Sequence, residues 1–552
     1  MSKTVKKVLI GSTFSVMILG LVAFKTVEDR YFEIAKNLDI FATLFKEVNA
    51  FYVDEINPND LMRTGISAML NSLDPYTDYI PEDDIENYRT LTTGQYGGIG
   101  ALVGKRNGIN TIIMPYEGYP AQKAGLQIGD KILAINGIDI TDKNTDDISR
   151  LLKGQSKTEI TLSILRYGQS DPFNVELKRE RITINNVPYS GMINEDIGFI
   201  KLTDFTTQAG KEVKDALNNL KAEGATKIIL DLRGNPGGLL DEAVNVSNVF
   251  VPKGAEIVST KGKVTSWNKT YTAPAEPVDT EIPLVVLTNS GSASAAEIVS
   301  GVMQDYDRGV LVGRKTYGKG LVQATRPLSY NSQLKITTAK YYIPSGRCIQ
   351  AIDYSHRNED GSVGRIPDSL KVAFTTRNGR KVFDGGGVDP DVAVDERRYA
   401  SITVALIGKN LIFDYATKYR YDNPEIGLAK DFKLTDDDYE DFVAWLSDKD
   451  FNYVTQVERT IKKLEKAAKE ERYFDDIQTA LESFKETAEV NKKDDLTRFK
   501  DEITYMLEQE LVSRYFFESG MIEAAFDDDQ DILAAVKILN DNDEYQRLLS
   551  SQ

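Results

Sequence analysis

The 552-residue sequence has very few of the side chains that most often hold metals: it contains one cysteine, Cys348, and one histidine, His356. A single cysteine excludes an intramolecular disulfide, and with a single histidine it also argues against a zinc site. The acidic stretches contain no Asp-x-Asx-x-Asx-Gly loop, so we expect no EF-hand calcium site. The composition therefore argues against both a zinc site and an EF-hand calcium site.

Basic side chains are in the minority, with 67 Lys and Arg against 84 Asp and Glu and a formal net charge of −17. This balance argues against nucleic acid as a partner, because phosphate binding needs a basic face. The 41% hydrophobic and 27% charged content is that of a globular protein, and the length allows two to four domains. We expect an α/β multidomain protein.

Charge is missing from residues 8–24, which follow Lys3, Lys6 and Lys7. As a helix this segment spans about 26 Å, close to the roughly 30 Å of a bilayer core. A cleavable signal peptide is the alternative, but no Ala-x-Ala pattern follows. We expect a single-pass anchor in the inner (cytoplasmic) membrane, with residues 1–7 in the cytoplasm and the rest of the chain periplasmic or otherwise extracytoplasmic.

Four patterns follow the expected anchor. Residues 25–93 carry a helical stripe of apolar side chains, residues 94–184 read as a small β-rich module, residues 185–398 alternate buried strands with amphipathic helices, and residues 399–552 are helical with few glycines. The third pattern predicts an α/β core.

In the last region we expect the apolar faces to be core and the acidic runs at 436–438 and 527–529 to be solvated. A role of these C-terminal helices in binding an adaptor or in self-association stays open.

The β-rich module resembles a PDZ domain in its order of elements and in glycine punctuation such as Ala124-Gly-Leu126. The resemblance implies that an extended peptide adds to an open sheet edge and that a nest of backbone N–H groups captures its C-terminal carboxylate. Gly98, Ile99 and Gly100 are the expected nest and substrate-binding residues. Alternatively, these glycines merely allow a tight turn.

A run of small residues at 289–296 lies between a buried-strand pattern and the start of a helical pattern. A serine at such a strand-to-helix turn is exposed and lies at the positive end of a helix. The alternative is structural, because Ser294-Ala-Ala-Glu297 is also a capping-box sequence in which Ser294 closes the helix start.

A serine hydroxyl is a weak nucleophile and needs a base. His356 lies in a polar stretch that we expect to be a solvated loop, which argues against a Ser-His-Asp triad. Lys319 is flanked by Gly318 and Gly320 and followed by an apolar run. Burial there would lower the lysine pKa from about 10.4 toward about 7 or 8, so that it accepts the serine proton. We interpret the run at 289–296 as the site of a serine nucleophile and Lys319 as its base.

Glycines at 234–238 follow a buried-strand pattern at 227–232 and lead into another helix. Backbone N–H groups at such a helix start are free to point at an anion. An oxyanion hole requires this arrangement, and one such donor typically stabilises the transition state by about 3 kcal/mol.

A phosphate-binding loop is a competing interpretation of Gly313-Arg-Lys-Thr-Tyr-Gly-Lys319, which fits the first seven positions of Gly-x-x-x-x-Gly-Lys-[Ser/Thr]. The eighth position is Gly320, which lacks the hydroxyl that binds magnesium. Residues 321–325 also read as a strand, whereas a P-loop leads into a helix. We therefore reject a nucleotide site.

Residues 35–395 resemble the carboxyl-terminal processing proteases, also called tail-specific proteases. The specific marks are Asp-Leu-Arg-Gly-Asn-Pro-Gly-Gly at 231–238, Gly-Ser-Ala-Ser-Ala-Ala-Glu-Ile at 291–298 and Tyr-Gly-Lys-Gly-Leu-Val-Gln at 317–323. Ser294 and Lys319 are 25 residues apart and Gln323 follows the lysine by four, which is the family's spacing. This spacing selects Ser294 over Ser290 and Ser292.

The resemblance implies a serine endopeptidase with a Ser-Lys dyad. Ser294 would attack the peptide carbonyl, Lys319 would act as general base and return the proton to the leaving amine, and Gln323 would hold the lysine by a hydrogen bond. The N–H groups of Ala295 and of Gly237 or Gly238 would bind the oxyanion.

The resemblance also implies the substrates, which are extracytoplasmic proteins or peptides with exposed apolar C-termini, recognised by the PDZ domain and cleaved without a metal or nucleotide. The competing hypothesis is a PDZ-type binding or scaffold protein on a protease-like core that no longer cuts.

Overall fold

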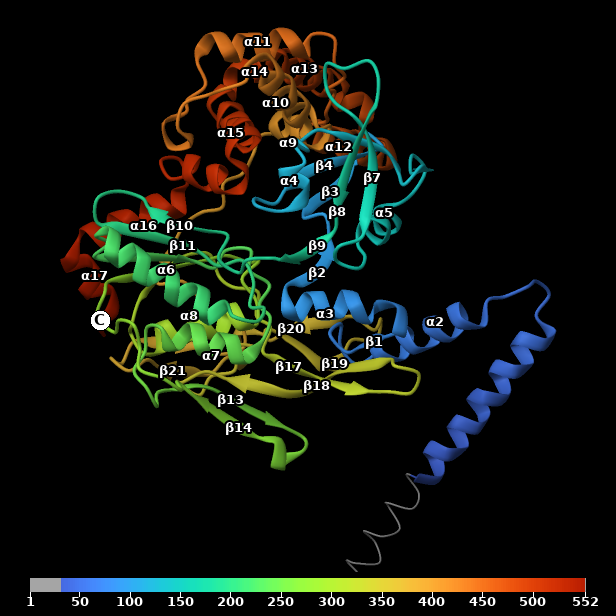
Figure 1. Cartoon of the computed structure of the whole chain (residues 1–552), viewed down its shortest axis with the longest axis vertical. Coiled ribbons are helices and arrows are strands. Elements are labelled where there is room, and N and C mark those ends of the chain that lie inside the picture. The colour runs from blue at the N-terminus through green and yellow to red at the C-terminus, as the bar shows by residue number, and fades with distance from the viewer. Residues whose placement is uncertain (1–30, 552) are drawn as a thin grey trace, which may run out of the picture. The chain divides into compact units, whose positions relative to one another are not determined.

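The structure, a computed structural model, describes residues 31–551 and divides into two units, Met1–Tyr79 and Ile80–Gln552 (Figure 1). In the described part of the first unit, residues 31–51 are helical and α2 (Pro58–Asn71) follows, as the apolar spacing predicts. The predicted membrane anchor at residues 8–24 lies outside the described residues. Between residues 31 and 551, no helix combines the length and the apolar character that crossing a bilayer requires.

A six-stranded sheet with the order β10-β11-β12-β15-β16-β23 forms the centre of the α/β core. Neighbouring strands are parallel except β10 and β11, which are antiparallel. The strands are β10 (Tyr189–Met192), β11 (Ile197–Lys201), β12 (Lys227–Asp231), β15 (Leu284–Thr288), β16 (Val310–Gly313) and β23 (Val392–Ala393). Continuous burial along β12 and β15 is typical of strands that are covered on both faces, and confirms the two predicted buried strands.

Helices cover both faces of this sheet. On one face lie α6 (Ala209–Glu223), α7 (Leu240–Asn248) and α8 (Ala295–Asp305), whose apolar side chains share a core with Ile228 and Leu230 of β12. On the other face lie α16 (Gln530–Asn540) and α17 (Asn542–Leu549), which pack against Ile229. The alternation along β12 follows from the two-residue period of a strand.

The parallel register brings three loops to one edge of the sheet. Asp231 of β12 pairs with Leu287 of β15, and Thr288 of β15 pairs with Gly313 of β16, so these three strands end side by side. Open α/β sheets bind ligands outside the carboxyl ends of their strands. The loops that start at residues 232, 289 and 314 therefore lie where a site is expected.

A second, antiparallel sheet contains β17 (Leu321–Pro327), β18 (Gln333–Tyr342), β13 (Glu256–Gly262) and β14 (Lys269–Thr272). β18 pairs with β17 and with β13, and β13 pairs with β14 across the 3-10 helix η2 (Thr265–Trp267). β17 begins two residues after Lys319. The predicted strand there is confirmed, which removes the phosphate-binding loop as an interpretation.

Short elements complete the core: β1 (Asp78–Ile80), η1 (Glu82–Asp84) and α3 (Ile85–Thr93) before the β-rich module, and the hairpins β19 (Ile352–Arg357) with β20 (Val363–Arg365) and β21 (Ala373–Thr375) with β22 (Lys381–Phe383), separated by η3 (Asp368–Leu370).

The β-rich module is a sheet of order β3-β4-β5-β7-β8, with β6 paired to β5. Its elements are β2 (Gln95–Gly98), β3 (Ala101–Arg106), β4 (Ile109–Pro115), α4 (Pro120–Lys123), β5 (Lys131–Ile135), β6 (Ile138–Asp139), α5 (Thr145–Leu152), β7 (Glu159–Leu165), β8 (Phe173–Lys178) and β9 (Glu180–Thr183). β2 and β9, which are the first and last strands of the module in the sequence, pair with each other as an antiparallel ribbon. β3 is an edge strand of the sheet, which leaves one side of it for a further strand.

The C-terminal region is helical, as predicted. It contains α9 (Ser401–Gly408), α10 (Leu411–Asp422), η4 (Ala429–Asp431), α11 (Asp436–Leu446), α12 (Gln456–Glu471), α13 (Phe474–Lys493), α14 (Asp495–Arg498) and α15 (Lys500–Ala524) before α16 and α17. A hydrophobic core around Phe442 and Leu507 joins helices that precede Phe526. Residues from Phe526 onward pack instead on the α/β core. The region expected as one helical domain therefore packs in two parts.

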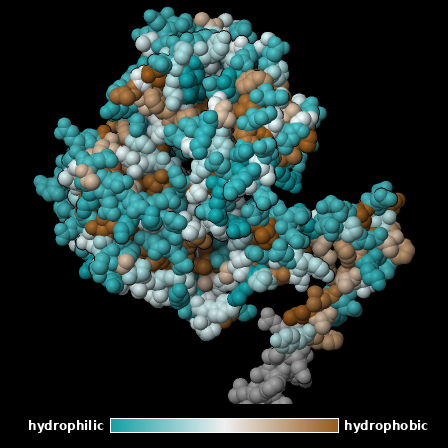
Figure 2. Space-filling model, in the orientation of Figure 1, coloured by the Kyte–Doolittle hydropathy of each residue, from teal (hydrophilic) through white to brown (hydrophobic). Residues whose placement is uncertain are grey.

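Much of the face of the second unit seen in Figure 2 is hydrophilic, with smaller hydrophobic patches between. This surface agrees with the large share of charged residues in the sequence.

Candidate active site

The loop between β15 and α8 presents three serines in three different environments. Ser290 is exposed, while Ser292 is fully buried, accepts a hydrogen bond from Asn289 N at 3.0 Å and donates to Leu232 O at 2.8 Å. Ser294 is half-buried, directly precedes α8, and has φ 55° and ψ −112°. A positive φ on a residue other than glycine stores backbone strain, which is common at active sites. A strained serine between a strand and a helix also resembles the nucleophile turn of other hydrolases. The geometry thus assigns Ser292 to structure and makes Ser294 available for chemistry.

Glu297, in the first turn of α8, joins the serine loop to the lysine loop. Its Oε1 accepts hydrogen bonds from Thr316 Oγ1 at 2.6 Å and from Gly318 N at 2.7 Å, and its Oε2 accepts from Lys319 N and Ser294 N at 2.8 Å each. The capping interaction predicted from the sequence is present in the bond to Ser294 N. The same carboxylate therefore fixes the backbone on both sides of the site.

The Glu297 carboxylate is fully buried, with 0% of the residue exposed. Burial raises its pKa from 4.5 to about 7, although the hydrogen bonds from Thr316 and from three backbone N–H groups act in the opposite direction. The ionised form is the one that can accept all four bonds at once. Glu297 is thus a costly buried charge whose ionisation holds two loops together.

Tyr341 of β18 forms a second link between the loops. Its buried hydroxyl donates to Ser294 O at 3.1 Å and also lies against Lys319 O. Gly320, directly after the lysine, donates its N–H to Gln350 Oε1 at 2.7 Å. The backbone of Lys319 is consequently held at both its N–H and its carbonyl, and its side chain is half-buried.

Ser294, Lys319 and Gln323 line one cleft of about 450 Å³. Its apolar lining includes Leu239, Leu240, Ala295, Ile298, Leu321 and Val322. Gln323 Nε2 donates to Thr337 Oγ1 at 3.1 Å, which fixes the orientation of the amide. The structure therefore brings together the predicted nucleophile, base and glutamine, in a cleft suited to an apolar side chain.

The predicted oxyanion donors lie against the serine turn. Gly237 has φ 95°, and a Cβ there would lie 2.8 Å from Ser294 Cβ and 2.8 Å from Ala295 N. Gly237 N donates to Asn235 Oδ1 at 2.8 Å. The N–H groups of Gly238 and Ala295 have no acceptor within residues 31–551. Of the two glycines, Gly238 therefore has the N–H that can bind an oxyanion together with Ala295.

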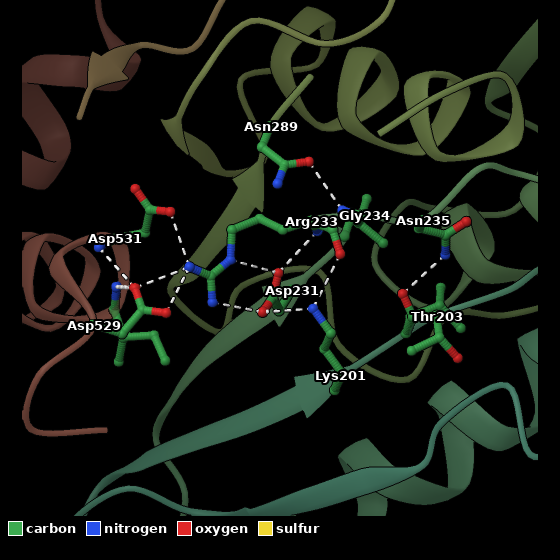
Figure 3. A network of polar contacts seen from close by, with 12 residues as sticks. Lys201, Thr203, Asp231, Arg233, Gly234, Asn235, Asn289, Asp529 and Asp531 are labelled. Carbon is green, nitrogen blue, oxygen red and sulfur yellow. Dashed lines mark hydrogen bonds and ion pairs between the residues drawn. The ribbon is translucent and has the colours of Figure 1, made fainter. Parts of the chain in front are cut away.

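The loop that carries these glycines is fixed by a network at the end of β12 (Figure 3). Arg233 Nε and Nη2 donate to the two oxygens of Asp231 at 3.0 and 2.8 Å, and Lys201 Nζ donates to Asp231 Oδ2 at 3.0 Å. Asn289 Oδ1 accepts from both Gly234 N and Gly291 N at 2.9 Å each. Asn289 thus connects the loop after β12 that carries Gly237 and Gly238, called here the oxyanion loop because its glycines are the predicted oxyanion donors, to the serine loop between β15 and α8.

Asp231 is almost fully buried, with 1% of the residue exposed. Burial alone would raise its pKa, but Arg233 and Lys201 outweigh burial and hold the pKa of this carboxyl well below its usual range. Asp231 therefore stays ionised at every pH at which the protein is expected to work.

The predicted nest of the PDZ-like module joins β2 to β3. Ile99 is buried in the core of the module, and the carbonyls of Ile99 and Gly100 accept hydrogen bonds from Ala121 N at 2.8 Å and Tyr116 N at 2.9 Å. Gly100 has φ 71°, and a Cβ there would lie 2.4 Å from the Tyr119 side chain. The turn is rigid and lies directly before the edge strand β3.

His356 lies away from these loops, in the hairpin of β19 and β20. Its side chain is 86% exposed and its Nδ1 pairs with Asp353 Oδ2 at 2.7 Å within the same strand. The expectation that this histidine is solvated is confirmed, but the expected loop is wrong, because residues 352–357 form a strand of an exposed hairpin.

Sequence reasoning missed two functional features. Glu297 was interpreted only as part of a cap, and its burial could have been suspected because it lies among Ala295, Ala296 and Ile298. The acidic run at 527–529 was expected to be solvated, which is wrong for Asp529, whose side chain is 20% exposed and bonded to Arg233. No local signal distinguishes Asp529 from its acidic neighbours.

Family models match three stretches of the chain. Peptidase family S41 matches residues 196–356, a PDZ domain matches residues 112–166, and the model described as "Probable PDZ-protease, C-terminal helical domain" matches residues 402–539.

Two relatives align over most of their own length. A "Carboxy-terminal-processing protease" of Bartonella bacilliformis is 37% identical over 321 residues, which cover 57% of this chain and 73% of the relative. A "Probable CtpA-like serine protease" of Staphylococcus aureus is 32% identical over 404 residues, which cover 72% of this chain and 73% of the relative. Among solved structures, the photosystem II D1 C-terminal processing protease is 26% identical with a TM-score of 0.34, over 64% of this chain and 92% of that one.

Proposed function

This chain belongs to peptidase family S41, the carboxy-terminal-processing serine proteases, and from that premise we propose that Ser294 and Lys319 are its catalytic dyad. The observation that carries the proposal is Glu297, whose carboxylate accepts hydrogen bonds from the backbone of both residues. A buried carboxylate that spans two loops next to one cleft is explained by a need to hold the nucleophile and the base in register.

The proposed reaction is acyl transfer followed by hydrolysis. Ser294 Oγ forms a bond to the carbonyl carbon of the substrate, and its proton passes to the neutral Nζ of Lys319. When the C–N bond breaks, Lys319 gives that proton to the leaving amine. A water molecule, deprotonated by the same lysine, then attacks the acyl carbon, and Lys319 returns the proton to Ser294 Oγ as the ester bond breaks and the acid product leaves. Gln323, held by Thr337, orients the lysine in this scheme.

The N–H groups of Ala295 and Gly238 are the proposed oxyanion donors. Both lie beside Ser294, and neither has an acceptor in the described part of the chain. Preorganised donors of this kind act where negative charge develops in the transition state and are among the largest contributors to catalysis.

The proposed substrates are proteins or peptides with exposed apolar C-termini. Support comes from β3, which is an edge strand beside α5, and from the turn at Ile99 and Gly100 that precedes it. An extended tail would add to β3 as a further strand, with its carboxylate at the turn. The apolar lining of the cleft at Ser294 suits the side chain next to the cleaved bond.

The proposed location is extracytoplasmic, with the chain anchored in the cytoplasmic membrane. This part of the proposal is supported by the charge-free run at 8–24 and the lysines before it.

Substitution of the two dyad residues tests the proposal. Ser294→Ala and Lys319→Ala should each lower the turnover of an unfolded protein with an apolar C-terminus by roughly 10⁴-fold or more, because a dyad acts as a unit. Ser290→Ala is the matched control, since Ser290 is an exposed serine of the same loop, and it should cleave normally. Near-normal cleavage by either dyad variant would refute the assignment, and unchanged substrate length with the wild type would favour a binding protein that does not cut.

A further inference from the structure

The side of Arg233 that faces away from Asp231 is held by two carboxylates of the C-terminal segment (Figure 3). Arg233 Nη1 donates to Asp529 Oδ1 at 2.9 Å, to Asp529 Oδ2 at 2.8 Å and to Asp531 Oδ2 at 2.9 Å. The guanidinium is 14% exposed, and these bonds complement the bidentate pair with Asp231. Arg233 is thus held between β12 and a segment almost 300 residues further along, since the sequence separation of Arg233 and Asp529 is 296.

The C-terminal segment that holds Arg233 is itself rigidly placed. Asp529 caps α16, because its Oδ1 accepts hydrogen bonds from Asp531 N at 2.9 Å and Ile532 N at 3.2 Å. Behind the cap, α16 and α17 bury apolar side chains against the core sheet. The two carboxylates therefore approach Arg233 from a fixed element, and not from a flexible tail.

One of the two carboxylates, that of Asp531, also reaches the lysine loop. Arg314, the first residue after β16, pairs with Asp531 Oδ2 at 3.4 Å. Arg314 N also donates to Thr288 O at 2.9 Å, and Thr288 Oγ1 donates back to Arg314 O at 2.9 Å. Asp531 consequently contacts the cations of two loops, one with the oxyanion donor and one with the proposed base.

The cluster is balanced in charge. Its cations are Lys201, Arg233 and Arg314, and its carboxylates are Asp231, Asp529 and Asp531. If the two C-terminal carboxylates are removed, Asp231 is the one carboxylate of the cluster left beside Lys201 and Arg233. The cluster then carries a largely buried positive charge that is poorly compensated. Such a charge is relieved by movement toward solvent, and here that movement displaces the backbone from residue 233 onward.

We propose that Asp529 and Asp531 are positioning residues for catalysis, which hold the oxyanion loop through Arg233 and the start of the lysine loop through Arg314. The C-terminal helices α16 and α17 are in this sense part of the active site, although they contribute no residue to the cleft. The inference rests on the proposed reaction at Ser294, because its consequence for turnover depends on the Gly238 N–H.

The test compares the full-length wild type with Asp529→Asn, Asp531→Asn and the double variant. Asparagine is a good helix cap, so Asp529→Asn keeps the start of α16 while it removes the charge opposite Arg233. We expect the double variant to lower kcat about 10- to 100-fold with KM within about twofold, because a misplaced oxyanion donor acts on the transition state. Asp529→Glu, which keeps the charge, should recover most of the lost kcat.

Asp528→Asn is the matched control, because Asp528 is the neighbouring carboxylate but pairs with Lys433 at 2.9 Å and not with Arg233. It should leave kcat unchanged. The inference is overturned if the folded double variant keeps kcat within about twofold of the wild type, if only KM rises, or if Asp528→Asn has the same effect as Asp529→Asn.

Hydrogen exchange provides a readout that does not depend on cleavage. In a Ser294→Ala background, the double variant should exchange faster than its parent in peptides covering residues 232–239 and 314–320, while peptides of the PDZ module stay unchanged. Unchanged exchange in those two loops would overturn the positioning role even if the proposed protease activity is absent. Failure of the proposed function appears separately, as cleavage that persists in Ser294→Ala.

Discussion

Replacing Glu297 by glutamine should weaken the link between the loops that carry Ser294 and Lys319, with almost no change in side-chain shape. Each carboxylate oxygen accepts two hydrogen bonds, Oε1 from Thr316 and Gly318 and Oε2 from Lys319 and Ser294. A glutamine must place its NH2 group where one of these oxygens lies. With the NH2 at the Oε2 position, Ser294 N and Lys319 N both lose their acceptor; with the NH2 at the Oε1 position, Gly318 N and the Thr316 hydroxyl lose theirs, and the lysine loop keeps one of its three bonds to residue 297.

The magnitude follows from the number of bonds that are lost. A hydrogen bond to a charged group is worth about 1.5–3 kcal/mol, so the loss of two weakens the link by about 3–6 kcal/mol. Part of this is offset, because the rise of the Glu297 pKa from 4.5 to about 7 means that the ionised carboxylate costs about 3 kcal/mol in the folded state. The middle of the remaining range is about 1.5 kcal/mol, so we expect kcat to fall about 10-fold, since each factor of ten corresponds to about 1.4 kcal/mol, while KM changes less than about threefold.

Steady-state cleavage of an unfolded substrate measures this effect, with thermal melting as a check on folding. Glu212→Gln is the matched control, because Glu212 lies in the first turn of α6 and accepts hydrogen bonds from Asn186 Nδ2 and Val187 N, both at 2.9 Å. It should alter stability but not kcat. If the folded Glu297→Gln enzyme turns over as fast as the wild type, the two loops are not held by this carboxylate and the reasoning is wrong.

Other expectations follow from the same geometry. Gly238→Ala should lower kcat roughly 10²-fold in steady-state kinetics, because a Cβ there would lie 2.4 Å from Phe205 O and so displaces the Gly238 N–H; unchanged kcat would show that catalysis does not depend on the position of this N–H. Ser292→Ala should lower the free energy of unfolding in denaturant titrations by about 1–3 kcal/mol and keep cleavage; lost cleavage at unchanged stability would point to Ser292 as the nucleophile. Cleavage should fall toward about pH 5 as Lys319 becomes protonated, and a flat profile would argue against a lysine base. Because the folded pKa of Glu297 is raised, its stability contribution is present below pH 4.5 and lost as the pH rises through about 7, so Glu297→Gln should reduce the difference in unfolding free energy between about pH 5 and about pH 8 by about 3 kcal/mol.

The spacing of Ser294, Lys319 and Gln323 could be predicted from the sequence because Ser294 and Lys319 belong to short loops that follow recognisable buried strands, and Gln323 lies in the strand that follows the second loop. Parallel neighbours such as β15 and β16 bring their carboxyl ends to one edge, so a local pattern is enough to predict that the loops meet. The resemblance to the carboxyl-terminal processing proteases is confirmed by the relatives. The choice among three serines needed the structure for its physical reason, since only the burial and hydrogen bonds of Ser292 identify it as structural.

The role of the C-terminal segment could not be predicted, because it depends on contacts between residues that are far apart in the sequence. Asp527, Asp528 and Asp529 have the same local chemistry, yet Asp528 pairs with Lys433 and Asp529 pairs with Arg233. Helical periodicity also predicted apolar faces at the end of the chain without telling which core they join. That choice is made by the uncovered face of the sheet, where Ile229 and Val285 need partners.

The two buried carboxylates of the site respond to pH in opposite ways, and the difference comes from what surrounds them. Asp231 faces Arg233 and Lys201, and these cations keep its pKa below the usual range in spite of burial. Glu297 is surrounded by neutral donors, so burial dominates and raises its pKa to about 7. Of the two, Glu297 alone changes its charge near neutral pH, and a protonated Glu297 can no longer accept all four of its hydrogen bonds. In the proposed mechanism, acidification therefore acts twice, by protonating Lys319 and by loosening the link between Lys319 and Ser294. The pH profile of Glu297→Gln, in which the second effect is absent, separates the two.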